Sequence, residues 1–390
     1  MAIADHPTLS RKVKINLQRN QQQDHTAKLK QAAEDFCYAD CRDRLWQREE
    51  FSLLYGTPLW QQASASQRLV LNHLYWVAYY SQIISAEIAT IFFNQTSAVG
   101  LYAVPGFGTI CEMLDLESAQ ERTHIATFQS IATQIEAELF GERLFTYPLR
   151  GPFLETIIFA KTNRIKQWWK ALQLHGFGLL SAGNAFLACQ YFTVRGLRTL
   201  NGKLIQHQLS HYCQTQPEAA PIPSQVSTYH FFDESFHFNS STILSQEVIQ
   251  CLPKPTKFEQ LIANLGIRGC QQDHRHFSVA INGIFWYDPA LYEVIYRLLR
   301  SRLFAFDHQG AIEMLWQCFG QETEGLNRSF QTHQNARIAY QSYLNGLDYV
   351  WPSNREMRLM GQAAIADYLQ RQRQAISHFR PSDRVSFSPS

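Results

Sequence analysis

The stretch His-Phe-Phe-Asp-Glu-Ser-Phe-His at residues 230–237 decides how the rest of this chain is interpreted. On a helix, His230, Glu234 and His237 occupy positions i, i+4 and i+7, so their side chains project from one stripe. Phenylalanines surround this stripe on both sides. Burying an unpaired charge among aromatic rings costs several kcal/mol unless a partner such as a metal ion compensates. The pattern therefore predicts a buried metal site.

A second segment carries the same chemistry. Glu121-Arg-Thr-His124 places a carboxylate and an imidazole at i and i+3 of another helical stretch, and Glu87 lies in a third. Two Glu-x-x-His segments on separate helices are typical of a carboxylate-bridged two-metal site in a helical bundle. A single Glu-x-x-His is common on solvated helix faces, so the prediction depends on all three segments together. Asp233 is expected to accept a hydrogen bond from a ligating histidine of a neighbouring helix.

The usual arrangement of such sites includes one more carboxylate, and this chain departs from it. The helix expected at residues 179–212 contains no Glu or Asp. Gln190 is its best-placed polar residue and is predicted to face the metals. The alternative for Gln190 is a buried hydrogen bond between helices. Glu155, on a different expected helix at residues 153–174, is the other candidate for the missing ligand.

The chain as a whole predicts an all-α fold. Long helical patterns occupy residues 64–94, 110–140, 153–174, 179–212 and 227–252, and there is no convincing strand pattern, Rossmann fingerprint or P-loop. The organisation expected is a ferritin-like helical bundle with additional C-terminal helices. Its parts are a polar N-terminal tail (1–30), the metal-binding helical bundle (31–252), additional helices packed on the bundle (253–380) and a disordered tail (381–390).

Composition excludes several classes of protein. With 390 residues, 45% of them hydrophobic, the chain can bury a large core, and a net charge of +2 does not call for a nucleic-acid partner. Eight cysteines without a regular framework are typical of cytosolic thiols. The polar, basic N-terminal residues argue against a secretory signal, and no apolar stretch reaches the roughly 20 residues of a membrane span. A cytoplasmic protein with no membrane contact is expected.

The order Glu87, Glu121-x-x-His124 and His230-x-x-x-Glu234-x-x-His237 resembles the ferritin-like p-aminobenzoate N-oxygenase family of di-iron proteins over roughly residues 65–250. Within this wider group, the chain is most similar to the cyanobacterial dimetal-carboxylate halogenases of the cylindrocyclophane type. The resemblance implies that the six residues hold two iron ions, or iron with manganese. It also implies dioxygen and chloride as co-substrates and an electron donor.

The halogenase resemblance implies natural-product biosynthesis, in which an unactivated carbon of a fatty acyl group is chlorinated on an acyl carrier protein. A neutral Gln190 in place of a carboxylate would leave room for chloride beside the metals and could donate a hydrogen bond to it. Basic clusters suited to an acidic carrier protein are Lys161/Arg164/Lys166 and Arg195/Arg198/Lys203. The alternatives are a di-iron N-oxygenase or hydroxylase, which needs no halide, and a non-catalytic helical metal-binding protein.

Overall fold

A computed structural model describes residues 7–145, 164–214, 220–274 and 291–381 of the chain. Every regular element within these ranges is helical, which confirms the all-α prediction. The longer helices are α1 (Pro7–Gln22), α2 (Thr26–Asp35), α4 (Ala65–Tyr102), α5 (Gly108–Phe140), α6 (Arg164–Ala182), α7 (Ala185–Gln214), α8 (Ile222–Thr242), α9 (Lys257–His274), α11 (Leu291–Arg300), α12 (His308–Phe319), α13 (Glu324–Leu344) and α16 (Ile365–Ser377). Shorter elements are η2 (Tyr38–Asp40), η3 (Glu49–Phe51), α3 (Pro58–Gln62), the π-helical turn η5 (Ile243–Glu247), η6 (Val248–Cys251), α14 (Pro352–Arg355) and α15 (Arg358–Gly361).

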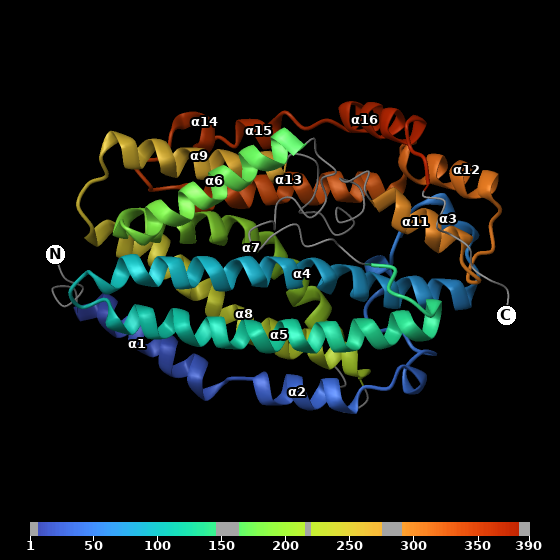
Figure 1. Ribbon diagram of the computed structural model, residues 1–390, viewed down its shortest axis with the longest axis horizontal. Coiled ribbons are helices and arrows are strands. Elements are labelled where there is room, and N and C mark those ends of the chain that lie inside the picture. Colours follow the sequence, from blue (N-terminus) through green and yellow to red (C-terminus); the bar gives the residue numbers. More distant parts are fainter. Residues whose placement is uncertain (1–6, 146–163, 215–219, 275–290, 382–390) are drawn as a thin grey trace.

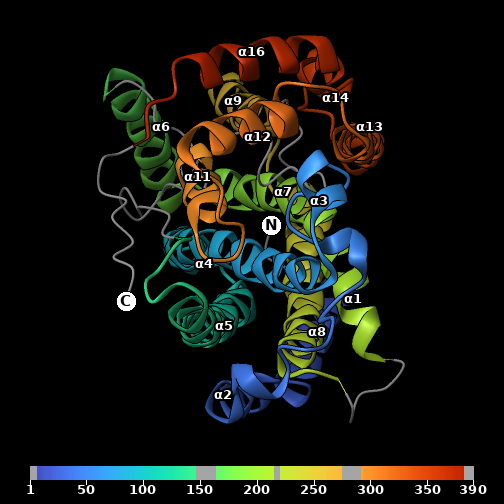
Figure 2. The same cartoon turned by 90° about the vertical axis from the view of Figure 1, so that its right-hand side faces the viewer.

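Four helices form the central bundle. Helix α4 packs along α5 and α7, and α8 packs along α7 and α5, so the four enclose one common interior. Figure 1 shows α4 and α5 side by side along the longest axis of the molecule, with α1 and α2 on one side and the C-terminal helices on the other. The end-on view in Figure 2 separates α2, at one edge, from α16, at the opposite edge. This arrangement agrees with a ferritin-like bundle carrying further helices.

Local sequence explains the length of the bundle helices. Ser64 and Gln67 form a reciprocal capping box at the start of α4, and no proline or glycine follows until Gly100. Gly100 is needed because an added Cβ would lie 2.4 Å from the backbone oxygen of Ser181, where α4 passes the end of α6. Helix α5 ends at Gly141, whose left-handed φ of 72° suits glycine.

The polar N-terminal segment differs from the prediction. Instead of a tail, residues 7–22 form helix α1, which packs on α5 and α8 and buries Leu9, Val13 and Leu17. These three apolar residues recur at four-residue spacing within a highly polar helix, so the narrow apolar stripe is masked in the overall composition. Asn16 and Asn20 are also buried, and they bond to bundle residues.

The boundary between α6 and α7 also differs from the prediction. The stretch Gly176-Phe-Gly178 does not end a helix: α6 continues through it to Ala182, and α7 begins only at Ala185. A glycine inside a helix costs about 1 kcal/mol relative to alanine, which packing can offset. At Gly178 an added Cβ would come within 3.2 Å of the Phe92 ring, so the close approach of α6 to α4 accounts for this glycine.

The C-terminal helices extend the bundle on one side. Helix α9 packs on α7, and α13 contacts α7 and α15, as expected for helices added to a bundle. The predicted tail at 381–390 lies outside the described residues except for residue 381. The described cysteines are all free thiols. None of the helices in the described ranges combines the length and apolarity required to cross a lipid bilayer.

His73, buried in α4, makes stability depend on pH. Burial lowers its pKa to about 4, and its ring nitrogens lie 2.8 Å from the Arg44 carbonyl and 3.1 Å from the Tyr38 hydroxyl. Because the unfolded chain takes up this proton below its ordinary pKa of 6.5, the stabilising contribution is complete above that pH and decreases as the pH falls toward 4. We expect a loss of about 3 kcal/mol in the free energy of unfolding from this residue.

Urea unfolding of the wild type and of His73→Gln at about pH 7 and about pH 4.5 checks this. The variant has no titrating group at this position, so its stability should depend less on pH. Equal pH dependence in the two proteins would contradict the prediction.

Candidate metal centre

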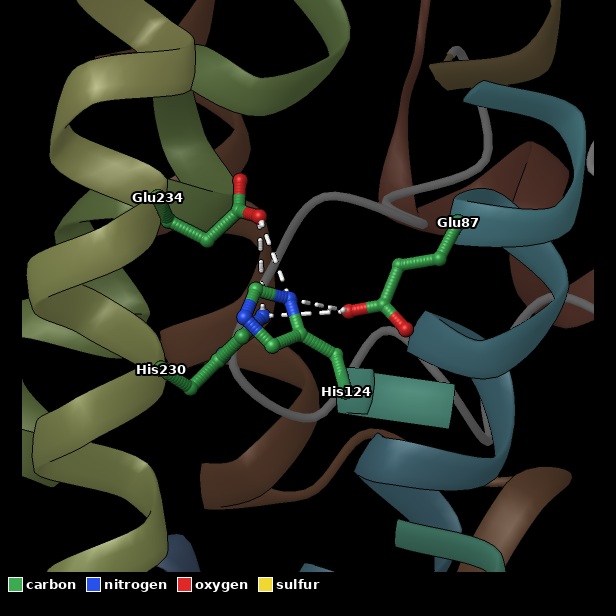
Figure 3. A group of neighbouring side chains, drawn as sticks. All are labelled: Glu87, His124, His230 and Glu234. Carbon is green, nitrogen blue, oxygen red and sulfur yellow. Dashed lines mark hydrogen bonds and ion pairs between the residues drawn. The ribbon is translucent and has the colours of Figure 1, made fainter. Parts of the chain in front are cut away.

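Three bundle helices bring the six expected ligands together. Glu87 projects from α4, Glu121 and His124 from α5, and the stripe His230, Glu234 and His237 from α8. Figure 3 shows four of these side chains converging from the three helices. All are buried except Glu234, which is partly exposed. The sequence prediction that these residues share one cluster thus agrees with the geometry.

The first of two ligand groups contains four residues, Glu87, His124, His230 and Glu234, each offering one atom within 4.8 Å of the others. Glu87 Oε1 lies 3.2 Å from His230 Nε2 and 3.5 Å from His124 Nδ1. Glu234 Oε1 lies 3.7 Å from His230 Nε2. Glu87 Oε2 is buried and has no hydrogen-bond partner among the described residues. A cation would complete the environment of this carboxylate.

The second group contains three residues, Glu121, Glu234 and His237. His237 Nδ1 lies 2.9 Å from Glu234 Oε1 and 3.3 Å from Glu121 Oε1. Glu121 reaches both groups, because its Oε2 lies 3.2 Å from His124 Nδ1. Glu234 belongs to both groups through a single oxygen. The two carboxylates are therefore placed to bridge two metal ions, and the second ion would have fewer protein ligands.

Outer contacts orient two of the imidazoles. His124 Nε2 lies 3.2 Å from Asp233 Oδ2, the contact expected from the sequence, and Asp233 Oδ1 lies 3.0 Å from His25 Nδ1. His237 Nε2 lies 2.9 Å from Gln120 Oε1, and the Gln120 amide donates to Asn20 in α1. These partners hold the Nδ1 atoms of both histidines toward the cluster, an arrangement usual around metal-ligating imidazoles.

The charges of the cluster are tightly coupled. Burial disfavours ionisation of Glu121 and Glu234. The neighbouring His237 nevertheless holds the pKa of each carboxyl below the ordinary value for a glutamate. Burial likewise opposes protonation of His124 and His237, but the surrounding carboxylates raise the pKa of each imidazole well above its usual range. Without metal, the site must take up protons to balance its carboxylates. Metal ions can replace these protons, so the donor set fits a pair of divalent cations.

The remaining expected site residues are placed differently. Gln190 is fully buried in α7, and its amide donates to the Ala263 carbonyl of α9 at 3.1 Å. This is a buried hydrogen bond between helices, which was the alternative prediction for Gln190. It belongs to neither ligand group. Glu155 lies outside the described residues. In the part of α7 nearest the cluster, the charged residue is Arg195, whose Nη2 lies 3.8 Å from Glu121 Oε1.

Arg195 was predicted to belong to a basic surface cluster, but the structure buries it. It is 5% exposed, and its Nη1 donates to Glu117 Oε2 at 2.7 Å and to Asn94 Oδ1 at 3.3 Å. Burial opposes its charge, but Glu117 raises its pKa well above the ordinary value, so it remains a cation. Sequence reasoning missed Glu117, although its position one helical turn before Glu121 marks the same face of α5.

The cluster lies at the inner end of a cavity of about 620 Å³. Glu87, Glu121, His230 and Glu234 line its buried end. Side chains from α4, α6, α7 and α9 form walls that are mainly apolar, and the lining residues Leu172 and Leu265 are 47% and 50% exposed. The cavity therefore leads from solvent between α6 and α9 to the ligand cluster.

Over residues 8–380 the chain matches the family described as CylC-like acyl halogenases. The chain belongs to this family. The match covers nearly the whole chain, including the C-terminal helices that the metal-binding pattern leaves unexplained. No curated protein and no solved structure shows significant similarity to the chain. Membership identifies the protein as a halogenase and confirms the resemblance to the cylindrocyclophane-type enzymes.

Proposed function

We propose that this chain is an oxygen-dependent dimetal-carboxylate halogenase that chlorinates an unactivated carbon of a fatty acyl group bound to an acyl carrier protein. One observation carries the proposal: the six candidate ligands form one cluster, and four of them line the buried end of an apolar cavity. Membership in the acyl halogenase family supports both the halogenation and the acyl substrate. The proposed function requires a metal centre and a binding cavity for an acyl chain at one site.

The proposed cofactor is a pair of iron ions, or iron with manganese. The cluster offers three carboxylates and three imidazoles, a donor set suited to such metals, whereas thiolate ligands are absent from the two groups that the described residues form. The chemistry that the bound pair supplies is the activation of dioxygen for attack on an unactivated carbon. The protein supplies the carboxylates that balance the metal charge and a buried environment that limits access of water.

The walls of the cavity are suited to an acyl chain. Ile83, Thr90 and Phe93 share the stripe of α4 that carries Glu87, with Ile83 one turn before Glu87 and the other two after it. Tyr191 stacks on Phe93 with ring centroids 4.9 Å apart. An alkyl chain lying along this stripe would gain free energy from leaving water and would present a carbon to the metals. Terminal attachment to a carrier protein leaves the anchored end of the chain at the mouth.

Arg268, exposed on α9, lines the cavity and marks where an acidic carrier protein would dock. Of the clusters expected from the sequence, Arg198 lines this same cavity, whereas Arg195 is buried. Lys161 and the side chains of Arg164 and Lys166 lie outside the described residues. Arg268→Glu should slow turnover of the carrier-bound substrate about tenfold or more at low salt, because attraction becomes repulsion. The same change at Arg11, exposed on α1, is the matched control and should have little effect.

Rates at increasing salt complete the comparison. The difference between wild type and Arg268→Glu should shrink as salt screens the interaction. Equal slowing by the substitutions at Arg268 and Arg11 would contradict docking at this mouth.

The function itself is tested by the intact mass of an acylated carrier protein after reaction with ferrous iron, an electron donor, oxygen and chloride. A mass increase equal to replacement of hydrogen by chlorine supports the proposal. A chloride-independent gain of oxygen would favour the N-oxygenase or hydroxylase alternative. Metal binding without any product would favour a non-catalytic metal-binding protein. Family membership argues against both alternatives.

A further inference from the structure

Arg195 places a buried positive charge on α7, the helix that in a ferritin-like bundle would be expected to offer a carboxylate. Both of its hydrogen bonds within the bundle, to Glu117 and Asn94, use Nη1. Nη2 is turned toward Glu121 Oε1 but, at 3.8 Å, is too far away for a hydrogen bond. The residue also lines the cavity. A guanidinium can therefore reach the space in front of the ligand cluster.

The position of Arg195 matches the asymmetry of the cluster. Its Nη2 faces Glu121 Oε1, which is the oxygen 3.3 Å from His237 Nδ1 and so belongs to the group with three protein ligands. The opposite Glu121 oxygen faces the four-residue group. The metal position with fewer protein ligands is thus the one beside the cation. An external anion bound there would meet positive charge on two sides.

We propose that Arg195 and the three-residue group Glu121, Glu234 and His237 form the halide site, with chloride or bromide held between the guanidinium and the metal. This inference rests on the proposed dimetal function. Glu117 lowers the affinity of this site for halide, because its carboxylate neutralises part of the Arg195 charge. Gln190 does not compete for this role, since its amide donates to the Ala263 carbonyl in α9.

A structural role for Arg195 makes a different prediction. If the residue only holds α7 to α5, the Arg195–Glu117 ion pair is what matters, and breaking it from either side should have the same consequence. If Arg195 binds halide, the two partners act in opposite directions. Removing the arginine charge weakens halide binding, whereas removing the glutamate charge strengthens it, because the guanidinium is no longer neutralised.

The experiment loads the full chain with cobalt(II), whose visible absorption responds to its ligands, and titrates chloride and bromide separately. Metal content is measured first for every variant. In the wild type, halide should produce a saturable spectral change. Arg195→Gln should weaken the apparent halide affinity by about tenfold or more, the usual effect of losing a charged hydrogen-bond donor. Glu117→Gln, which can still accept a hydrogen bond from Nη1, should bind halide more tightly than the wild type.

The outcomes separate the inference from the function on which it rests. A wild type that binds two metals but shows no halide response overturns the halide site and leaves the metal centre intact. A wild type that binds no metal overturns both. Shifts in the same direction for the two single variants also overturn the inference. Should Arg195→Gln fail to fold with Glu117 left unpaired, Glu117→Gln decides alone: tighter halide binding supports the site, and unchanged or weaker binding refutes it.

Discussion

Replacement of Glu234 by alanine should remove both metal ions and abolish halogenation. The reason is that one oxygen of this residue, Oε1, belongs to both ligand groups, 2.9 Å from His237 Nδ1 and 3.7 Å from His230 Nε2. Replacing His237, which belongs to the three-residue group alone, should leave about one metal per chain, because the other group keeps its four ligands. Elemental analysis after reconstitution measures both results.

The matched control is Glu247→Ala. Glu247 is a partly exposed carboxylate in η5, shortly after α8, that pairs with Lys12, so its loss should leave two metals and full activity. His124→Ala tests the four-residue group and should also lower metal content. Circular dichroism should show all four variants to be as helical as the wild type. Full metal content in both histidine variants would exclude these residues as ligands, and retention of two metals by Glu234→Ala would exclude a shared carboxylate.

The clustering of the candidate metal ligands was predictable because most of them follow helical periodicity. Spacings of three and four residues place His230, Glu234 and His237 on one face regardless of what surrounds them, and the same holds for Glu121 and His124. Glu87 carries no such spacing partner, so its assignment depended on the usual arrangement of two-metal bundles, in which a further helix supplies a single Glu. In each case the sequence predicted a residue's membership in the cluster, and the structure added which atom faces it.

Apart from the contact between Asp233 and His124, the outer contacts were not predictable, because each joins segments far apart in the chain. His25 reaches Asp233, and Gln120 connects His237 to Asn20 of a helix that the sequence suggested was a tail. Arg195 lacks any local pattern that distinguishes a buried cation from a basic surface residue. Only the ion pair that Arg195 of α7 makes with Glu117 of α5 shows that its charge is matched.

The all-α fold class could also be predicted from the sequence, whereas several helix boundaries could not. Long runs without proline or glycine predict helices such as α4 and α5 well, since nothing local interrupts them. Gly176 and Gly178 predicted the end of a helix, but α6 continues through both. At Gly178 the absence of a side chain allows α6 to pack closely on α4. The narrow apolar stripe of α1 was outweighed by its polar composition.

Filling the cavity should stop halogenation without disturbing the metals. Thr90 lies on α4 one turn beyond Glu87 and lines the cavity. An indole at this position would occupy the path of an acyl chain close to the metal ligands. We expect Thr90→Trp to keep two metals per chain and to lose about a hundredfold or more in turnover of the carrier-bound substrate, the scale of loss that follows misplacement of a reacting group. Elemental analysis and intact carrier-protein mass measure the two effects separately.

Val99→Trp is the matched control, because Val99 belongs to the same helix but is 61% exposed and is not part of the cavity lining. It adds a similar bulk and should leave both metal content and turnover unchanged. Short acyl chains offer a second comparison: if Thr90→Trp blocks only the inner part of the cavity, the loss should depend on chain length. Undiminished chlorination by Thr90→Trp would show that the substrate reaches the metals by another route. The apolar cavity would then have to be assigned a different role, while the assignment of the six candidate metal ligands would stand, since none of them is altered in this variant.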